Sequence, residues 1–345
     1  MSAHHSRIPR LSRVSVFALP AALSTLLLGA SASAMNLFVF HVDNPVGENH
    51  GYYRVGRDLD RNGDARSFTA VKTIPGWFGS ANQGADIAIA DIDDDGLDDL
   101  VALHIDNPGG ENHGYYRVGY GLTASGNLRW GWSDLLAIPG WFGAEDQGAG
   151  LAVADLDRNG SPDLLVFHID NPGGENHGYY RVGWDLDASG EALSWSEPIM
   201  IPGWFGSENQ GGAIAVGDID RNQRLDLLVF HIDNPQGENR GYYRIGWNLN
   251  AHGNASRWSN VKTVPGWFGS ENQGAGVALG DVNRDGWLDL LAFHIDNPGG
   301  ENHGYYRVGY GLNTAGDLTR GWTSPKLVAG WFGSENQGAG IAITP

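Results

Sequence analysis

The chain has 345 residues, with 40 acidic and 22 basic side chains, a formal net charge of −18 at pH 7 and no cysteine. This acidity disfavours DNA, RNA and anionic lipid as partners, because each carries negative charge of its own. Without cysteine, an exported protein of this sequence needs a source of rigidity other than disulfides, and ring closure together with bound metal would supply it.

The N-terminal segment 1–34 has the features of an export signal. Three arginines precede an apolar run over residues 14–30, and the small residues 32–34 follow it. We expect cleavage near Ala34, so that the mature protein starts at Met35 and is secreted or periplasmic; an uncleaved membrane anchor is the alternative. Removing the three arginines leaves 19 basic and 40 acidic residues, a net charge of −21.

One segment recurs five times, in the pattern His-x-Asp-Asn-Pro-x-Gly-Glu-Asn-x-Gly-Tyr-Tyr-Arg, and each copy ends in Gly-Trp-Phe-Gly. The copies begin at His41, His104, His168, His231 and His294, so that successive starting positions differ by 63 or 64. Excluding the segment 1–34 leaves 311 of the 345 residues, which is about 62 for each of five copies. The repeats therefore fill residues 35–345 as one domain. This period is typical of a propeller or a similar closed array.

One repeat contains four apolar or alternating segments separated by turn residues. In the third copy they cover residues 148–155, 163–170, 178–186 and 195–201. Four short antiparallel strands of this kind make one blade of a propeller. The first segment is rich in Gly, Ala and Val, as expected for the innermost strand, where blades crowd around the axis.

The two ends of the chain complement each other. Residues 338–345 contain only a first strand, whereas residues 36–43 have the character of a second strand. Pairing these two strands would complete one blade and hide both strand edges. The sequence therefore predicts an all-β fold: a five-bladed β-propeller of four-stranded antiparallel blades, closed by pairing of the N- and C-terminal strands.

Between the first and second strands lie four acidic loops with oxygen-bearing side chains at positions 1, 3, 5 and 9. Dense, turning loops of oxygen ligands suit calcium, and the backbone carbonyl at position 7 would add a further ligand. The predicted ligands are Asp91, Asp93, Asp95, Leu97 and Asp99; Asp155, Asp157, Asn159, Ser161 and Asp163; Asp218, Asp220, Asn222, Arg224 and Asp226; and Asp281, Asn283, Asp285, Trp287 and Asp289.

Four calcium sites are expected instead of five, because the fifth junction falls at the chain ends. The glycine at position 6 is replaced by Gln223 in the third loop, which should strain that loop and make the site at Asp218 the weakest. The alternative is that the acids cap ordinary turns without metal. The acidic segment 58–64 is interpreted as a hairpin turn, because its counterparts lack the acids.

The order of a small-residue strand, an Asp-x-Asp-x-[Asp/Asn]-Gly-x-x-Asp-Leu loop, an apolar strand and an aromatic strand resembles the FG-GAP or VCBS repeats of integrin-like β-propellers. The resemblance covers residues 36–345 and implies calcium ligation at the acidic positions above. Integrin-type propellers have seven blades, so the number five rests on the copies in this chain. Some bacterial and fungal lectins with repeated blades are similar in plan, but no sugar-binding residue is carried over from them.

Two repeated polar loops are candidates for ligand contact, because Asp, Asn and Glu bond to neighbouring hydroxyls and Trp offers a flat face to a sugar ring. The candidates are Asp43, Asn44, Glu48, Asn49 and Trp77; Asp106, Asn107, Glu111, Asn112 and Trp141; Asp170, Asn171, Glu175, Asn176, Trp204 and Glu208; Asp233, Asn234, Glu238, Asn239, Trp267 and Glu271; and Asp296, Asn297, Glu301, Asn302, Trp331 and Glu335. The alternative is packing, because duplication copies structural residues as faithfully as functional ones. We expect a core position for the strand histidines and an ion pair for Arg181 and its copies.

No serine elbow, zinc-binding helix motif or phosphate loop occurs in the sequence. A glycosidase needs carboxylates that converge on one site, and in this chain the acids recur in every repeat. The favoured interpretation is a non-catalytic, calcium-stabilised binder of glycans or cell surfaces that gains from avidity. An adhesion or scaffold protein that recognises a protein partner is the first alternative, and a glycosidase or lyase acting on polysaccharide is the second.

Overall fold

A computed structural model gives the structure of the protein, and its described residues all belong to the unit Ala34–Pro345. They are residues 35–44, 48–76, 78, 84–107, 111–140, 142, 148–171, 175–203, 205, 211–234, 239–266, 268, 274–297, 301–330, 332 and 338–344. The predicted export signal lies outside them. Within these ranges, no helix has the length and apolar character needed to cross a membrane.

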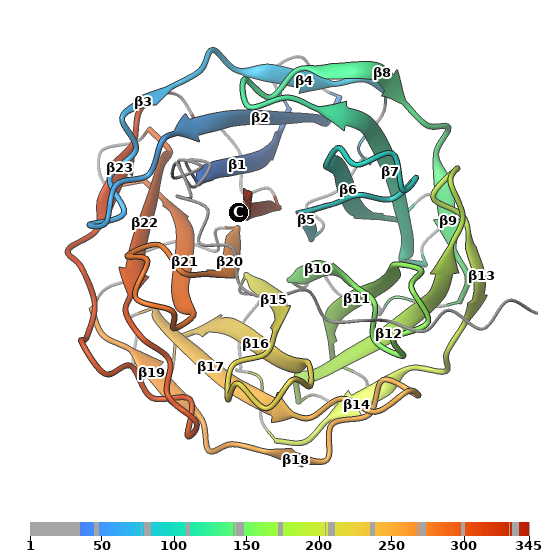
Figure 1. The fold of residues 1–345 in the computed structure, drawn as a ribbon. Helices are drawn as coiled ribbons and strands as arrows, with labels where there is room; N and C mark the ends of the chain where they lie inside the picture. The colour runs from blue at the N-terminus through green and yellow to red at the C-terminus, as the bar shows by residue number, and fades with distance from the viewer. Residues whose placement is uncertain are drawn as a thin grey trace, which may run out of the picture. The chain divides into compact units, whose positions relative to one another are not determined.

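The unit is all-β, and its five antiparallel sheets surround one axis as the blades of a propeller (Figure 1), which confirms the predicted fold. Blade 1 contains β24 (Ala339–Thr344), β1 (Asn36–Asp43), β2 (His50–Arg57), β3 (Ser67–Phe68) and β4 (Lys72–Ile74); blade 2 contains β5 (Ala85–Ala90), β6 (Asp99–Asp106), β7 (His113–Leu122), β8 (Leu128–Trp132) and β9 (Leu136–Ile138); blade 3 contains β10 (Ala149–Ala154), β11 (Asp163–Asp170), β12 (His177–Leu186), β13 (Ala192–Trp195) and β14 (Ile199–Ile201); blade 4 contains β15 (Gly212–Gly217), β16 (Asp226–Asp233), β17 (Arg240–Trp247), β18 (Arg257–Trp258) and β19 (Lys262–Val264); and blade 5 contains β20 (Ala275–Gly280), β21 (Asp289–Asp296), β22 (His303–Gly309) and β23 (Lys326–Val328).

The outermost strand of a blade is interrupted. In blade 3 the bounds of the predicted fourth strand, residues 195–201, are wrong: two short strands, β13 (Ala192–Trp195) and β14 (Ile199–Ile201), take its place, and both pair with β12. Pro198 lies between them, and proline has no backbone N–H to donate to a ladder. The outer edge of the blade is therefore short and irregular, which protects it from pairing with another chain.

The two ends of the chain close the ring within blade 1. Strand β24 pairs antiparallel with β1, in a register that places Thr344 opposite Asn36 and Ala339 opposite His41. The last strand thus becomes the innermost strand of the first blade, as predicted. Both termini of the unit are held by this sheet, and no inner strand is left without its second strand among the described residues.

The core lies between blades. Each of the five clusters of buried apolar side chains draws its members from two adjacent blades, so every blade is stabilised by its neighbours. Small residues of the inner strands permit this packing: a Cβ added at Gly150 would lie 2.6 Å from the backbone nitrogen of Ile214 in the next blade. A Cβ at Gly150 would therefore clash with the next blade, and close contacts of this kind favour small residues in the inner strands.

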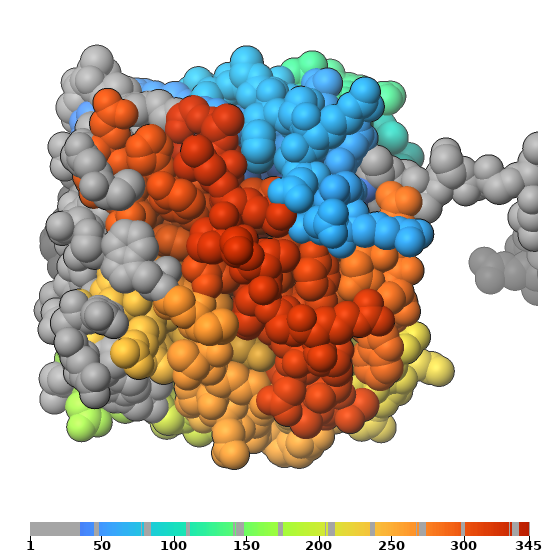
Figure 2. Space-filling model, turned by 90° about the vertical axis from the view of Figure 1, so that its left-hand side faces the viewer, coloured from blue at the N-terminus to red at the C-terminus, as the bar shows by residue number. Residues whose placement is uncertain are grey.

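A tyrosine hydroxyl joins each blade to the next. Between blades 3 and 4, the buried Tyr180 hydroxyl donates to the Gly253 carbonyl at 2.7 Å. Between blades 5 and 1, Tyr306 donates to the Gly63 carbonyl at 2.8 Å, across 243 residues of sequence. The remaining junctions have the same bond, from Tyr53, Tyr116 and Tyr243. Figure 2 shows the closing junction from outside, where the blue segment around β3 lies beside the red segment that leads to β23.

Because consecutive strands run antiparallel, the loops of a blade alternate between the two faces of the ring. The acidic loops between the first and second strands open on the same face as the hairpin turns that follow the third strand. The two repeated polar loops open on the opposite face. The candidate metal sites and the candidate ligand loops are therefore on opposite faces of the ring.

Candidate metal centres and ligand loops

Each of the four acidic loops folds around its first carboxylate. In blade 2, Asp91 Oδ1 accepts a hydrogen bond from the Asp95 N–H at 3.2 Å, and Oδ2 accepts one from the Gly96 N–H at 2.9 Å. The same pair of bonds forms around Asp155, Asp218 and Asp281. The four loops thus share the same hydrogen bonds around their first carboxylate.

The acid at position 9 anchors the loop to the third strand. Asp99 is fully buried and accepts hydrogen bonds from the N–H groups of Ile92 at 3.0 Å and Gly121 at 2.7 Å. Blade 1 has no acidic loop, and there the neutral Asn36 side chain accepts the equivalent bond from the Asp58 N–H at 3.1 Å. A neutral amide is therefore sufficient for the anchor, and the buried charge in the other blades calls for a further partner.

Burial raises the pKa of Asp99, Asp226 and Asp289 to about 6. Desolvation is the largest cause; backbone hydrogen bonds oppose it, and nearby carboxylates add to it. An ionised carboxylate in this position costs free energy when it faces only other carboxylates, whereas a bound cation would stabilise the ionised form.

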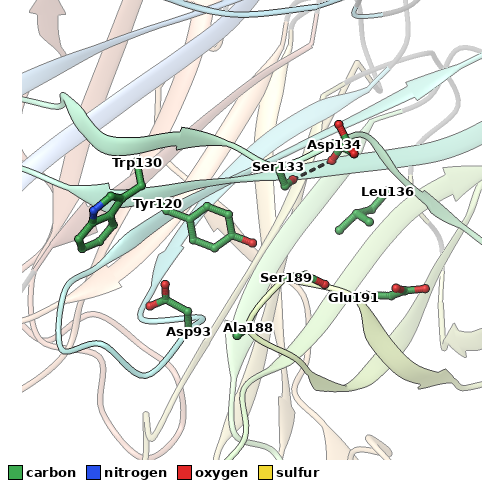
Figure 3. A pocket seen from close by; sticks show the side chains of 9 residues that line it. All are labelled: Asp93, Tyr120, Trp130, Ser133, Asp134, Leu136, Ala188, Ser189 and Glu191. Atoms are coloured by element: carbon green, nitrogen blue, oxygen red, sulfur yellow. Dashed lines mark hydrogen bonds between the residues drawn. The ribbon is translucent and has the colours of Figure 1, made fainter.

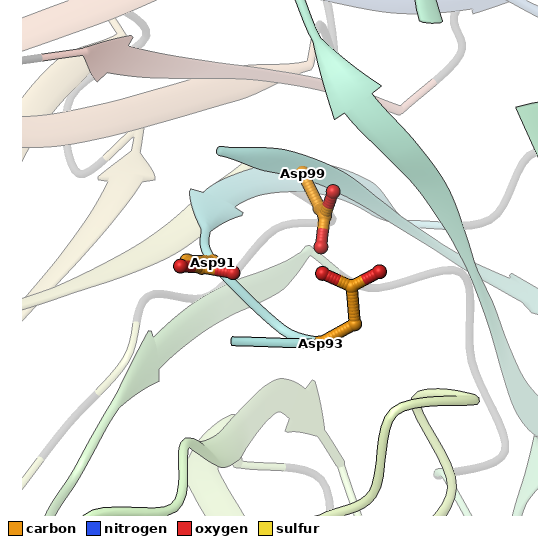
Figure 4. Close-up of side chains that lie close together, drawn as sticks. All are labelled: Asp91, Asp93 and Asp99. Carbon is orange, nitrogen blue, oxygen red and sulfur yellow. The ribbon is translucent and has the colours of Figure 1, made fainter. Parts of the chain in front are cut away.

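In three loops the carboxylates converge closely enough to share one ion. One oxygen from each acid lies within 4.8 Å of the others, and Figure 4 shows the group in blade 2, where Asp93 and Asp99 point toward the same space as Asp91. The three groups are Asp91, Asp93 and Asp99; Asp155, Asp157 and Asp163; and Asp218, Asp220 and Asp226. Such all-oxygen groups fit a hard divalent cation.

The fourth loop is less acidic at its centre. Position 3 is the neutral Asn283, and the Asp285 carboxylate at position 5 lies 2.8 Å from the Arg320 guanidinium. Arg320 thus forms an ion pair with one carboxylate of this loop. The metal site predicted in blade 5, with the carbonyl ligand of Trp287, stays a prediction, as do the carbonyl ligands at Leu97, Ser161 and Arg224.

The third loop is strained at the expected position. Gln223 has a φ of 68°, in the left-handed region, where Gly96, Gly160 and Gly286 stand in the other loops with φ between 84° and 95°. A side chain in this region costs about 1–2 kcal/mol. Strain of the loop at Gln223 is therefore confirmed, whereas weaker metal binding there stays a prediction.

Two of the polar side chains in each copy of the first polar loop are buried. Its aspartates, Asp43, Asp106, Asp170, Asp233 and Asp296, are fully buried, and its second asparagines, Asn49, Asn112, Asn176, Asn239 and Asn302, are 1–3% exposed. In four of the copies the first asparagine donates to the second, as Asn44 does to Asn49 at 3.1 Å. These side chains stabilise the loop, and their contact with a ligand stays a prediction that would require the loop to open.

Fewer of the residues predicted to contact a ligand are exposed to solvent. Among the described glutamates of this loop, Glu48, Glu111, Glu175 and Glu301 are exposed. The five tryptophans of the Gly-Trp-Phe-Gly loop lie outside the described residues, as do Glu208, Glu238, Glu271 and Glu335. The two polar loops nevertheless meet: the Phe142 N–H donates to the Asn112 carbonyl at 3.2 Å, and Phe78 and Phe268 make the same bond.

The repeated histidines are core residues, as expected. His168 is 2% exposed and lies between the Phe142 ring of the preceding blade, at 5.1 Å, and Tyr179 of its own blade, at 5.6 Å. The ion pair expected for the repeated arginine is replaced in blade 2, where the Arg117 guanidinium donates to the Pro75 carbonyl of blade 1 at 2.6 Å. The histidine and the arginine of the repeat thus serve the junctions between blades.

One acid that occurs in a single repeat was not predicted from the sequence. Asp86 lies in the inner strand of blade 2, is 1% exposed, and accepts hydrogen bonds from the N–H groups of Ile87 at 2.8 Å and Leu151 at 2.9 Å. Burial raises its pKa well above the ordinary value. An alignment of the inner strands against one another would have shown it, because the other four have Gly150, Ala213, Gly276 and Gly340 at this position.

No protein family matches the sequence, and no curated protein matches it significantly.

Proposed function

We propose that this chain is a secreted, calcium-stabilised propeller that binds carbohydrate at several equivalent places without catalysis. The observation that carries the metal part is the contrast between Asp99 and Asn36. Both side chains anchor the third strand of a blade, but the charged one occurs where an acidic loop is present and the neutral one where it is not. A cation explains why the charge is retained at a buried position.

Calcium is the ion that suits these loops best. The converging ligands are carboxylate and amide oxygens, which hard cations prefer, and the loops offer neither thiol nor imidazole. Each ion would connect the inner, second and third strands of a blade, because Asp99 belongs to β6 and bonds to the N–H of Gly121 in β7. At free calcium a hundredfold above the dissociation constant, each loop would add about 2.7 kcal/mol of stability.

The carbohydrate part rests on repetition and chemistry. The two polar loops of a repeat open on one face of the ring. In three repeats a backbone hydrogen bond joins them, and four of the described loops carry an exposed glutamate. Several weak sites on a rigid ring favour a repetitive target such as a glycan, through avidity. Asp86 breaks the symmetry of the inner strands, but it is buried and bonded to backbone N–H groups, so this acid offers no exposed carboxylate to a substrate.

The test is binding of the purified protein to a broad glycan array, with calcium and again with a chelator. We expect calcium-dependent binding to a related set of glycans, together with a lower melting temperature in the chelator. A folded protein that binds no glycan in either condition would refute the carbohydrate part. It would favour the adhesion alternative, in which the ring recognises a protein.

A further inference from the structure

The side chain of Asp86 lies where the inner strands of the ring meet. Its strand, β5, is the innermost strand of blade 2 and lies beside the inner strands of both neighbouring blades (Figure 1). Oδ2 accepts a hydrogen bond from the Leu151 N–H of β10 at 2.9 Å, whereas Oδ1 occupies the place that a Cβ at Gly340 of β24 would take. One carboxyl group therefore contacts blades 1, 2 and 3 at the axis.

At this level the axis has room for one carboxyl group only. A Cβ at Gly150 would lie 2.6 Å from the Ile214 nitrogen of blade 4, and a Cβ at Gly276 would lie 2.6 Å from the Ile341 nitrogen of blade 1. The inner strands of those junctions are thus too close for an acidic side chain. Five copies of Asp86 could not share this space, which explains why the acid occurs in a single repeat.

The backbone supplies the groups that hold this carboxyl group. Asp86 is 1% exposed, and its two oxygens accept hydrogen bonds from the N–H groups of Ile87 at 2.8 Å and Leu151 at 2.9 Å. None of the ion pairs among the described residues includes it. Buried N–H groups need acceptors, and two donors directed at two oxygens are suited to a carboxyl group.

We propose that the axis of this ring is a binding site for one carboxyl group, which Asp86 fills from within, and that the filled site holds the closing strand β24 against blades 2 and 3. The site consists of the backbone of β5 and β10 together with Gly340 of β24. It goes beyond the proposed calcium and carbohydrate binding, because neither the acidic loops nor the polar loops contribute to it.

Removal of the side chain should open the site to a carboxylic acid from solution. Asp86→Gly deletes a methylene and a carboxyl group, and acetic acid supplies the same heavy atoms. The matched control is Ala213→Gly, which shortens the equivalent side chain in blade 4 without removing a carboxyl group. Thermal and urea denaturation are compared in acetate, in chloride and in the bulkier pivalate. Mildly acidic pH is used, because burial raises the pKa of Asp86 and the site thus favours the neutral acid.

The hollows on the surface do not compete with the axis in this experiment. Asp93, Asp134 and Glu191 line the hollow between blades 2 and 3, and no described lysine or arginine does, so this hollow repels a carboxylate (Figure 3). The hollow at the closing junction contains Lys326, which pairs with Asp64. Both hollows are present in the native protein, which therefore measures any effect of acetate outside the axis.

We expect Asp86→Gly to lower the folding equilibrium constant by at least about fivefold, because the buried Leu151 N–H loses its acceptor. Acetate at about tenfold above its dissociation constant should raise this constant about tenfold in Asp86→Gly. It should act no differently from chloride on the native protein and on Ala213→Gly, and pivalate should be too large to enter. No advantage of acetate over chloride in Asp86→Gly, an equal advantage in Ala213→Gly, or an equal effect of pivalate would overturn the proposal.

A double-mutant cycle tests the same site without an added ligand. A Cβ at Gly340 would collide with Oδ1 of Asp86, so Gly340→Ala should lower the folding equilibrium constant of the native protein by more than about tenfold. Asp86→Gly removes the colliding group and should therefore stabilise Gly340→Ala, although it destabilises the native protein. If Asp86→Gly destabilises both proteins equally, the carboxyl group does not fill the space beside β24, and the proposal is wrong.

Discussion

The tyrosine hydrogen bonds between blades lead to a quantitative prediction about ring stability. In Tyr180→Phe the ring keeps its packing, but the buried Gly253 carbonyl loses a hydrogen bond that is 2.7 Å long in the native protein. Leaving a buried acceptor without its donor costs about 1–3 kcal/mol. With an unfolding entropy of about 2.1 cal/mol/K per residue, the part of the chain from Met35 to Pro345 has an unfolding entropy of about 0.65 kcal/mol/K. The melting temperature should therefore fall by about 1.5–5 °C.

The neighbouring tyrosine provides a matched control. Tyr179 precedes Tyr180, stacks on His168 at 5.6 Å and is only partly buried, and no described residue accepts a bond from its hydroxyl. Tyr179→Phe should thus change the melting temperature by less than about 1 °C. Both variants are compared by thermal and urea denaturation at the same calcium concentration. Equal stability of the two variants would refute the assigned role of the hydroxyl.

Tyr306→Phe extends the test to ring closure. Its hydroxyl joins the last blade to the first across 243 residues of sequence, so its loss should destabilise the protein by an amount similar to Tyr180→Phe. A loss of stability in Tyr180→Phe but not in Tyr306→Phe would mean that the closing junction is held by other contacts, such as the pair of β24 and β1.

Four further predictions concern stability and pH. Burial, aided by a nearby arginine, lowers the pKa of the five strand histidines, such as His231, to about 3, so the unfolded chain binds protons that the folded chain does not. The free energy of unfolding should therefore be highest above about pH 6.5 and fall toward pH 3, by up to about 1.4 kcal/mol per pH unit for each histidine. A melting temperature that does not depend on pH would contradict this. Because burial raises the pKa of Asp86, its contribution is full below the ordinary value and is lost as the pH rises, so the stability of the native protein relative to Asp86→Ala should decrease with rising pH in urea titrations. Gly150→Ala brings a Cβ to 2.6 Å from the Ile214 nitrogen and should lower the free energy of unfolding by about 3 kcal/mol, seen as a lower urea midpoint. An unchanged midpoint would show that the inner strands of blades 3 and 4 can move apart to accommodate the methyl group. Gln223→Gly removes a side chain at a φ of 68° and should raise both stability, by about 1 kcal/mol, and the calcium affinity of the third loop; lower stability would mean that the glutamine makes a compensating contact.

The blades and the ring closure were predictable because they follow from period and pattern. Five copies with one nearly constant period, together with complementary strands at residues 36–43 and 338–345, leave few alternatives to a closed ring. The acidic loops were predictable for the same reason: Asp91 and its counterparts keep one spacing, and one spacing of Asx residues gives one loop conformation.

The residues that were not predicted depend on contacts between blades. Asp43 and its copies have the composition of a surface loop, but in the structure they are fully buried. Asp86 is one acid in an apolar segment, and only the ring places it against the N–H of Leu151 in the next blade.

Calcium stoichiometry tests the central claim most directly. The native protein and Asp99→Asn are each titrated with calcium by calorimetry after complete removal of metal. Asparagine retains the strand anchor, as Asn36 does in blade 1, so this variant removes charge without removing the hydrogen bond. The account predicts one ion for each of the four acidic loops, a melting temperature that rises with calcium, and the loss of one ion in Asp99→Asn. A native protein that binds no calcium, with a melting temperature that a chelator leaves unchanged, would contradict it.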